Sequence, residues 1–191
     1  MTDLPALKRA VARVRAIDGA ADAWLGTAFY IGEGLVLTAL HVVLPRPPAS
    51  VALRVKLEFL AAAHETEATL LAHDDTADWA LLRCEQPPLV APLRAADAVA
   101  DGEAWTAYGF PGLVEQGLVV GGQVRDARAR ESAAMPALQL FCDEAAAGQG
   151  APLHGLSGSP CMVDDRVVGL LRSTPQDSVL DGQGRGRPVT V

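Results

Sequence analysis

The feature that most constrains the fold is a series of short apolar segments, each bounded by glycine, proline or aspartate. In the first half of the chain these segments cover residues 26–31, 34–40, 51–59 and 79–84. Residues 11–17 fit either a further strand or the extension of a short helix that begins near Leu4. No long helical period accompanies them. Short strands at this spacing predict an all-β sandwich or barrel.

The second half of the chain repeats this pattern, with segments at residues 103–109, 118–125, 138–142, 160–163, 167–172 and 188–191. Between the two halves, residues 85–101 contain three prolines, which suits a linker better than a strand. We therefore expect two β lobes, an N-terminal lobe over residues 1–92 and a C-terminal lobe over residues 93–191.

Composition and charge exclude several classes of protein. An apolar fraction of 50% with a net charge of -7 argues against disorder, and the acidic balance argues against a nucleic-acid partner. No window approaches twenty uninterrupted apolar residues, so no membrane span is expected. The charged N-terminus lacks the apolar run of a secretory signal, and we expect a cytoplasmic protein.

The cysteines argue against disulfides and metal binding. Cys84, Cys142 and Cys161 are odd in number and widely spaced, and no pair has the spacing of a metal or redox motif. Reduced, partly buried thiols are the expected state, in agreement with a reducing compartment. We expect neither a metal nor an organic cofactor.

The segment with the most specific chemistry is GLSGSP, residues 155–160. A serine hydroxyl becomes a nucleophile only when a base takes its proton and donors await the oxyanion. Gly155 and Gly158 let the backbone turn sharply, so that consecutive N–H groups can point into one small space beside Ser157. An ordinary Gly/Ser hairpin turn is the alternative interpretation of the same segment.

A base for Ser157 has to come from one of four histidines. His41 ends the apolar strand GLVLTALHVV, which places an imidazole at the rim of a buried sheet, although a core histidine is an alternative. His64 lies in a polar segment and is expected to be solvated, and His73 is expected to form a surface ion pair with the neighbouring aspartates. His154 is interpreted as a pocket or loop residue.

The carboxylate that would orient the imidazole is best represented by Asp78. It precedes the apolar segment WALL, so that the acid lies at the entrance of a buried strand. Asp74 and Asp75 are more exposed by context and remain the alternatives.

Three segments in this order, GTAFYIGEGLVLTALHVV, DWALL and GLSGSP, resemble the His, Asp and Ser boxes of trypsin-like (chymotrypsin-fold) serine proteases. The resemblance covers about residues 10–191, and the overall style is similar to bacterial intracellular trypsin-like peptidase domains. It implies two packed six-stranded antiparallel β-barrels with an active site in the cleft between them. It also implies a triad of His41, Asp78 and Ser157, with the oxyanion bound by the backbone N–H groups of Gly155 and Ser157.

The resemblance further implies where a substrate would bind. The strand that ends at Arg172, together with Ser173 and Thr174, would run along the substrate, and the segment from Ala151 to His154 would wall the first specificity pocket. Digestive trypsins carry an acid at the position of Ala151, so we expect small or apolar side chains to be accepted at least as well as Lys or Arg. A solvated strand end is the alternative for Arg172.

The expected function is therefore a serine endopeptidase that acts on a protein or peptide substrate through an acyl-enzyme. Similar bacterial domains occur beside NTPase, repeat or defence modules, which makes a regulatory NTPase or effector an expected partner. Two alternatives remain: a latent protease-fold domain that binds a protein partner, and an α/β-hydrolase esterase. The second requires the order Ser…Asp…His, whereas the order here is His…Asp…Ser.

Overall fold

Strands dominate the described part of the chain. The computed structural model describes residues 1–17, 24–44, 54–111, 114–132, 135–143, 155–172 and 189–190. The helical elements are α1 (Leu4–Ala10), α2 (Leu40–Val43) and the 3-10 turn η1 (Leu60–Ala62). The strands are β1 (Val11–Ala16), β2 (Trp24–Gly32), β3 (Leu35–Ala39), β4 (Arg54–Phe59), β5 (His64–Asp74), β6 (Trp79–Cys84), β7 (Arg94–Ala95), β8 (Ala104–Gly109), β9 (Leu118–Asp126), β10 (Arg130–Ser132), β11 (Met135–Pro136), β12 (Gln139–Cys142), β13 (Pro160–Val163), β14 (Arg166–Leu170) and β15 (Val189–Thr190).

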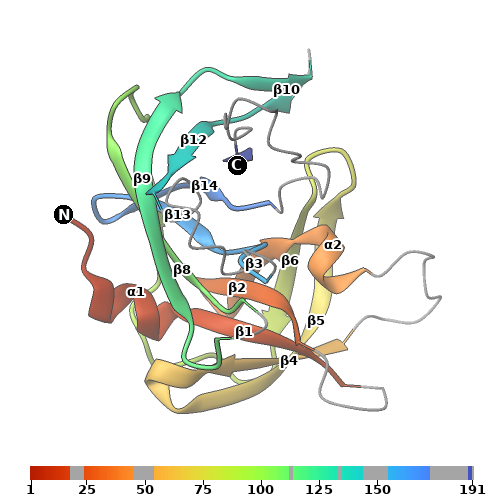
Figure 1. The fold of residues 1–191 in the computed structure, drawn as a ribbon. Coiled ribbons are helices and arrows are strands. Elements are labelled where there is room, and N and C mark those ends of the chain that lie inside the picture. Colours follow the sequence, from red (N-terminus) through yellow and green to blue (C-terminus); the bar gives the residue numbers. More distant parts are fainter. Residues whose placement is uncertain are drawn as a thin grey trace.

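The first six strands close into an antiparallel barrel with the order β1-β2-β3-β6-β5-β4, drawn in red to yellow in Figure 1. The strand interpretation of residues 11–17 is confirmed and the helix extension is wrong, because α1 ends at Ala10 and β1 covers Val11–Ala16. Asp3 caps the helix by accepting a hydrogen bond from the N–H of Ala6. Alternate residues of β1, such as Ala12 and Val14, then face the barrel core.

One barrel strand was not expected from the sequence. The sequence pattern predicts no strand over residues 64–74 and places His64 in a polar segment, yet these residues form β5, which pairs with β4 and β6. Most of its side chains are at least partly exposed, and only Thr66 and Ala68 are buried. A barrel strand whose outer face is exposed to solvent therefore has a sequence as polar as that of a loop.

Apart from β10 and β11, which pair in a separate two-stranded sheet, the strands of the second half form a sheet with the order β15-β12-β9-β8-β13-β14-β7, drawn in green to blue in Figure 1. This sheet has seven described strands where six were expected, because the two residues of β7 in the expected linker pair in parallel with β14. A closed barrel and a second β sheet confirm the all-β, chymotrypsin-type fold class. The described part of the strand expected at residues 188–191 is β15.

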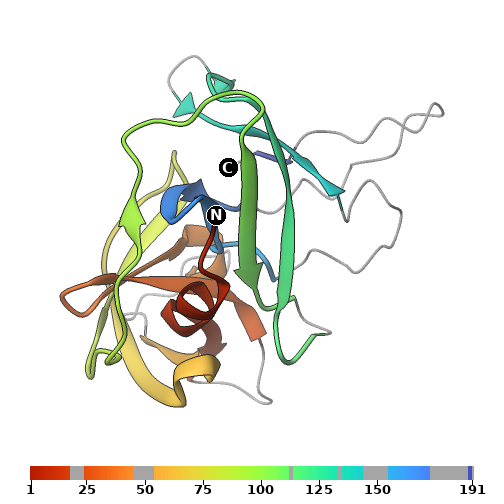
Figure 2. The same cartoon turned by 90° about the vertical axis from the view of Figure 1, so that its left-hand side faces the viewer.

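An apolar cluster joins the two lobes. Leu7 of α1 and Val11 pack with Phe29 of the barrel and with Tyr108 and Met162 of the second sheet. Figure 2 shows α1, in red, at the junction between the barrel and the green strands. The lobes are therefore fixed against each other on the side of the molecule that carries α1. Among the described helices, none has the length and apolar character needed to cross a membrane.

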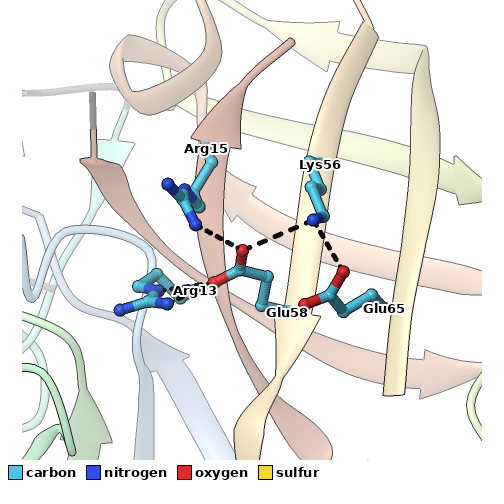
Figure 3. A network of polar contacts seen from close by, with 5 residues as sticks. All are labelled: Arg13, Arg15, Lys56, Glu58 and Glu65. Carbon is cyan, nitrogen blue, oxygen red and sulfur yellow. Dashed lines mark hydrogen bonds and ion pairs between the residues drawn. The ribbon is translucent and has the colours of Figure 1, made fainter. Parts of the chain in front are cut away.

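A charged network covers the outer face of β1 and β4 (Figure 3). The Glu58 side chain, only 3% exposed, accepts hydrogen bonds from Arg13 Nε at 2.8 Å and from Arg15 Nη1 at 2.7 Å. The Lys56 ammonium lies 3.7 Å from Glu58 and 2.6 Å from Glu65. Burial raises the pKa of Glu58, but the hydrogen bonds and charges of the two arginines outweigh it and lower that pKa below its ordinary 4.5.

We expect Glu58→Gln to destabilise the domain by about 3 kcal/mol or more, because it removes the negative charge that two largely buried guanidinium groups bind. Urea denaturation at pH 7 measures this free energy of unfolding. Glu65→Gln is the matched control: its side chain is 59% exposed, and its loss is expected to cost less than about 1 kcal/mol.

Wild type and Glu58→Gln also test how the stabilisation by Glu58 depends on pH. Since the pKa of Glu58 is lowered on folding, its ionised form stabilises the fold fully above pH 4.5, and this stabilisation is lost as the pH falls through the folded pKa. The stability gap between wild type and Glu58→Gln should therefore narrow below pH 4.5. A gap that stays constant down to pH 3 would contradict the ionic role of Glu58.

Candidate active site

The turn that carries Ser157 is shaped by two glycines. Gly155 and Gly158 have φ angles of +100° and +83°, in the left-handed region that favours glycine. A Cβ atom on Gly158 would lie 2.1 Å from the carbonyl oxygen of Thr27 and 2.4 Å from Thr38 Oγ1. The backbone at residue 158 is thus pressed against β2 and β3, and a side chain at that position would break the contact.

Hydrogen bonds from both lobes hold this turn. Thr27 of β2 donates from its backbone N–H to the Ser157 carbonyl at 3.0 Å and from Oγ1 to the Gly155 carbonyl at 2.7 Å. From the other side, the N–H of Gly158 donates to the Leu171 carbonyl at 2.7 Å. Ser157 is only 5% exposed. The backbone position of Ser157 is therefore set by contacts with both lobes.

Three consecutive N–H groups in the turn have no acceptor among the described residues. They are those of Gly155, Leu156 and Ser157, whereas the N–H groups of Gly158 and Ser159 each donate a hydrogen bond. Backbone donors in buried turns are normally paired, so such a set is unusual. It includes Gly155 and Ser157, the two groups that the sequence predicts as oxyanion donors.

The strand register brings His41 and Asp78 together. In the antiparallel pair β3–β6, Ala39 lies opposite Trp79, so residues that follow Ala39 meet residues that precede Trp79. His41 lies in the one-turn helix α2 and not at the end of a strand, because the chain turns into a helix at Leu40. Asp78 has a φ of +55°, an uncommon conformation for a residue other than glycine.

Asp78 binds His41 through both carboxylate oxygens. Oδ2 lies 2.7 Å from His41 Nδ1, and Oδ1 accepts a hydrogen bond from the backbone N–H of His41 at 3.0 Å. The Asp78 carbonyl also accepts a hydrogen bond from the N–H of Leu40 at 3.0 Å. Asp78 therefore pairs with N–H groups in the first turn of α2, where a helix offers no acceptor of its own. This arrangement fixes the imidazole ring with its Nε2 edge turned away from the carboxylate.

A cation completes the surroundings of Asp78. Arg172, which follows β14, donates from Nε to Asp78 Oδ2 at 3.1 Å. Burial acts to raise the pKa of Asp78, but hydrogen bonds from His41 and the charges of His41 and Arg172 lower it below its ordinary value. Asp78 is therefore held as a carboxylate at neutral pH.

The alternative acids and bases have other roles. Asp74 Oδ1 accepts hydrogen bonds from the N–H groups of Thr76 and Ala77, which closes the turn before Asp78. Asp75 lies 3.7 Å from His73, as expected for a surface ion pair. His64 is not simply solvated, because its Nε2 lies 2.9 Å from the carbonyl oxygen of Gln86.

Four of the expected substrate-binding residues, Ala151, His154, Ser173 and Thr174, lie outside the described residues. A pocket of about 340 Å³ lies beside Asp78. Small or apolar residues form most of its lining, and Arg172 forms one wall: Ala77, Ala127, Pro136, Ala137, Leu138, Val168, Gly169, Leu170 and Arg172. Ala77 precedes Asp78 in the chain and Arg172 donates to its carboxylate, so the pocket adjoins the His41–Asp78 pair.

The described residues place neither a metal site nor a reactive thiol beside this group. Among them, no cluster of His, Cys, Asp and Glu side chains could hold a metal ion. The three cysteines, all of them described, are buried and form no disulfide, and burial raises the pKa of Cys84 to about 11 and that of Cys161 to about 12. Both thiols thus stay protonated at neutral pH.

Sequence reasoning missed two features of the site. Thr27, fully buried, joins β2 to the Ser157 turn and also accepts a hydrogen bond from the N–H of Phe110 at 2.9 Å. A buried threonine within an apolar strand was the available signal. Arg172 was expected along the substrate, and no local pattern points to its contact with Asp78.

Comparisons with solved structures find the same fold in known proteins. The fold is similar to the active form of the Rv3671c protease from M. tuberculosis (TM-score 0.72, 22% identity, covering 98% of this chain and 77% of that chain). It is also similar to the MamO protease domain from Magnetospirillum magneticum (TM-score 0.68, 20% identity, 97% and 93% covered). The HtrA-type protease AlgW, solved with a decapeptide, gives a TM-score of 0.71 at 17% identity, with 98% of this chain and 61% of that chain covered.

These identities are low, and the likeness concerns the fold alone. No curated protein matches the sequence significantly. The family model of the trypsin-like peptidase domain, however, matches residues 26–170, well over half of the chain. The match includes His41, Asp78 and Ser157. The chain therefore belongs to the trypsin-like peptidase domain family and has the fold of a trypsin-like serine protease.

Proposed function

We propose that this domain is a serine endopeptidase that hydrolyses peptide bonds through Ser157, His41 and Asp78. The observation that carries the proposal is the 2.7 Å contact between His41 Nδ1 and Asp78 Oδ2. It occupies one ring nitrogen and leaves Nε2 as the base for a hydroxyl. From the resemblance alone, we extend the proposal to a cytoplasmic processing or effector domain of a bacterial signalling or defence system, with a regulatory NTPase or effector as partner.

In the proposed reaction Ser157 Oγ attacks the scissile carbonyl while His41 Nε2 accepts its proton. Asp78 stays ionised and stabilises the imidazolium, which then gives the proton to the leaving amine. Water attacks the resulting acyl-enzyme with His41 again as base, and the acid product leaves. The N–H groups of Gly155 and Ser157, which have no acceptor in the described part of the chain, support this scheme as donors for the oxyanion.

Labelling with a fluorophosphonate probe tests the proposal directly. An activated serine reacts with the probe, and mass spectrometry of the digested protein is expected to place the adduct on Ser157. Ser159, two residues away and fully buried, is the internal control and should remain unmodified. A latent domain that only binds a protein partner would leave both serines unlabelled, and that result would favour the alternative.

The pocket beside Asp78 supports a preference for apolar side chains in the substrate. Its lining is mostly alanine, proline, valine and leucine, and a buried aliphatic side chain is worth about 1.5–3 kcal/mol. A peptide-library cleavage profile should therefore show small or apolar residues accepted at least as well as Lys or Arg. Exclusive cleavage after basic residues would contradict this preference without affecting the triad.

Filling the pocket gives a sharper test. We expect Ala127→Phe to lower kcat/KM about tenfold or more for a peptide whose Leu side chain would enter the pocket. The loss should be much smaller for the matched peptide with Ala at that position. The rate of fluorophosphonate labelling should not change. Ala104→Phe, at an exposed position of β8, is the control. Equal losses for both peptides would show that the pocket does not hold a substrate side chain.

A further inference from the structure

The contact between Arg172 and Asp78 has a role that the family resemblance does not supply. We propose that Arg172 is a positioning residue that holds the Asp78 carboxylate, and through it the His41 imidazole, in the orientation that proton transfer requires. This inference rests on the proposed function, because it concerns the same reaction. It replaces the expectation that Arg172 only runs along the substrate.

Each oxygen of Asp78 has defined donors. Oδ1 accepts the backbone N–H of His41 at 3.0 Å, and Oδ2 lies 2.7 Å from His41 Nδ1 and 3.1 Å from Arg172 Nε. Among the described residues, His41 and Arg172 are the titratable or charged groups in contact with this carboxylate. With Arg172 removed, only His41 would restrain its rotation.

The position of Arg172 is tied to the nucleophile turn. The preceding residue, Leu171, is 4% exposed, donates to the Ser159 carbonyl at 2.8 Å and accepts from the N–H of Gly158 at 2.7 Å. The backbone that presents Arg172 is therefore fixed to the turn of Ser157. One short segment thus sets the spacing between the nucleophile and the acid.

The local environment distinguishes this contact from an ordinary surface ion pair. The side chains of Arg172 and Asp78 are 22% and 15% exposed, so water screens them only in part. By contrast, Arg166, the first residue of β14, lies 3.5 Å from Asp165, with side chains 47% and 74% exposed. A guanidinium is always charged and has rigidly placed donors, which suits it to fix one carboxylate oxygen.

The charge of Arg172 also has a consequence for the base. A cation beside Asp78 offsets part of the carboxylate charge and disfavours a second cation on the nearby imidazole. Its removal should favour the protonated, inactive imidazole. The acid limb of the kcat/KM profile should then move to higher pH, which a purely structural role of Arg172 would not cause.

The experiment compares wild type, Arg172→Met, Arg172→Lys and the control Arg166→Met. We expect Arg172→Met to lower kcat/KM about tenfold or more, as for loss of a hydrogen bond to a charged group, and to move the acid limb up by about 0.5–1 pH unit. Arg172→Lys keeps the charge and should recover part of both effects. Arg166→Met should match wild type.

A second readout does not depend on catalysis. The proton shared by His41 and Asp78 gives a low-field NMR signal, which should broaden or shift in Arg172→Met and stay unchanged in Arg166→Met. Unchanged kcat/KM, pH profile and NMR signal in Arg172→Met would overturn the inference. So would a loss of activity that follows thermal stability alone, with the acid limb unmoved. A wild-type protein without activity would instead count against the proposed function, and the NMR comparison would still decide the role of Arg172.

Discussion

Purified Ser157→Ala protein is expected to cleave peptides on the order of a millionfold more slowly than wild type, because the only nucleophile of the proposed reaction is lost. The substitution removes one hydroxyl from a turn whose shape is set by backbone contacts. The carbonyl of Ser157 still accepts from Thr27, and Gly158 still donates to Leu171. The melting temperature should therefore stay within a few degrees of wild type, which separates loss of chemistry from loss of fold.

Ser159→Ala is the matched control. Ser159 lies in the same turn and is fully buried, and its Oγ is a buried side-chain oxygen without a hydrogen-bond partner among the described residues. Removing an unpaired buried hydroxyl is expected to leave activity unchanged and to leave stability unchanged or raised by about 1 kcal/mol. Cleavage by purified Ser157→Ala protein at more than a trace of the wild-type rate would refute the assignment of the nucleophile.

The apolar strands could be predicted because their pattern is local. Residues 79–84 and 160–163 were delimited correctly, since each is an apolar run with a clear break on either side. β5 was missed for the opposite reason: with most of its side chains partly exposed, its pairing with β4 and β6 is what makes it a strand. β7 was missed because only its tertiary partner β14 makes it a strand.

The residues of the site also differ in whether a local pattern predicts them. His41, Asp78 and Ser157 each stand in a recognisable local segment, and the sequence could nominate them. The sequence could not choose firmly between Asp78 and Asp74, because that choice depends on the register of β3 against β6. The contact of Arg172 with Asp78 joins residues 94 positions apart and leaves no trace in local spacing. The same holds for the pocket, which is lined by residues of β11 and β14 and by residues that follow β9, β11 and β14.

Asp78→Asn is expected to lower kcat about ten-thousandfold while leaving the fold intact. An asparagine keeps an oxygen that can accept the backbone N–H of His41, as Oδ1 does at 3.0 Å. Its amide nitrogen would replace Oδ2, which lies 2.7 Å from His41 Nδ1 and 3.1 Å from Arg172 Nε. A donor there forces Nδ1 to accept, so that the ring carries its proton on Nε2 and cannot take one from Ser157.

The neighbouring acids supply the controls for this prediction. Asp74→Asn keeps the side-chain oxygen that accepts from Thr76 and Ala77, and Asp75→Asn changes a side chain that is 82% exposed, so both variants should retain nearly full activity. Steady-state kcat on one peptide substrate, with circular dichroism to verify folding, distinguishes the three positions. A large loss of kcat in Asp74→Asn or Asp75→Asn, with kcat retained in Asp78→Asn, would assign the triad acid to the preceding turn. Loss confined to Asp78→Asn is the result that the register of β3 and β6 leads us to expect.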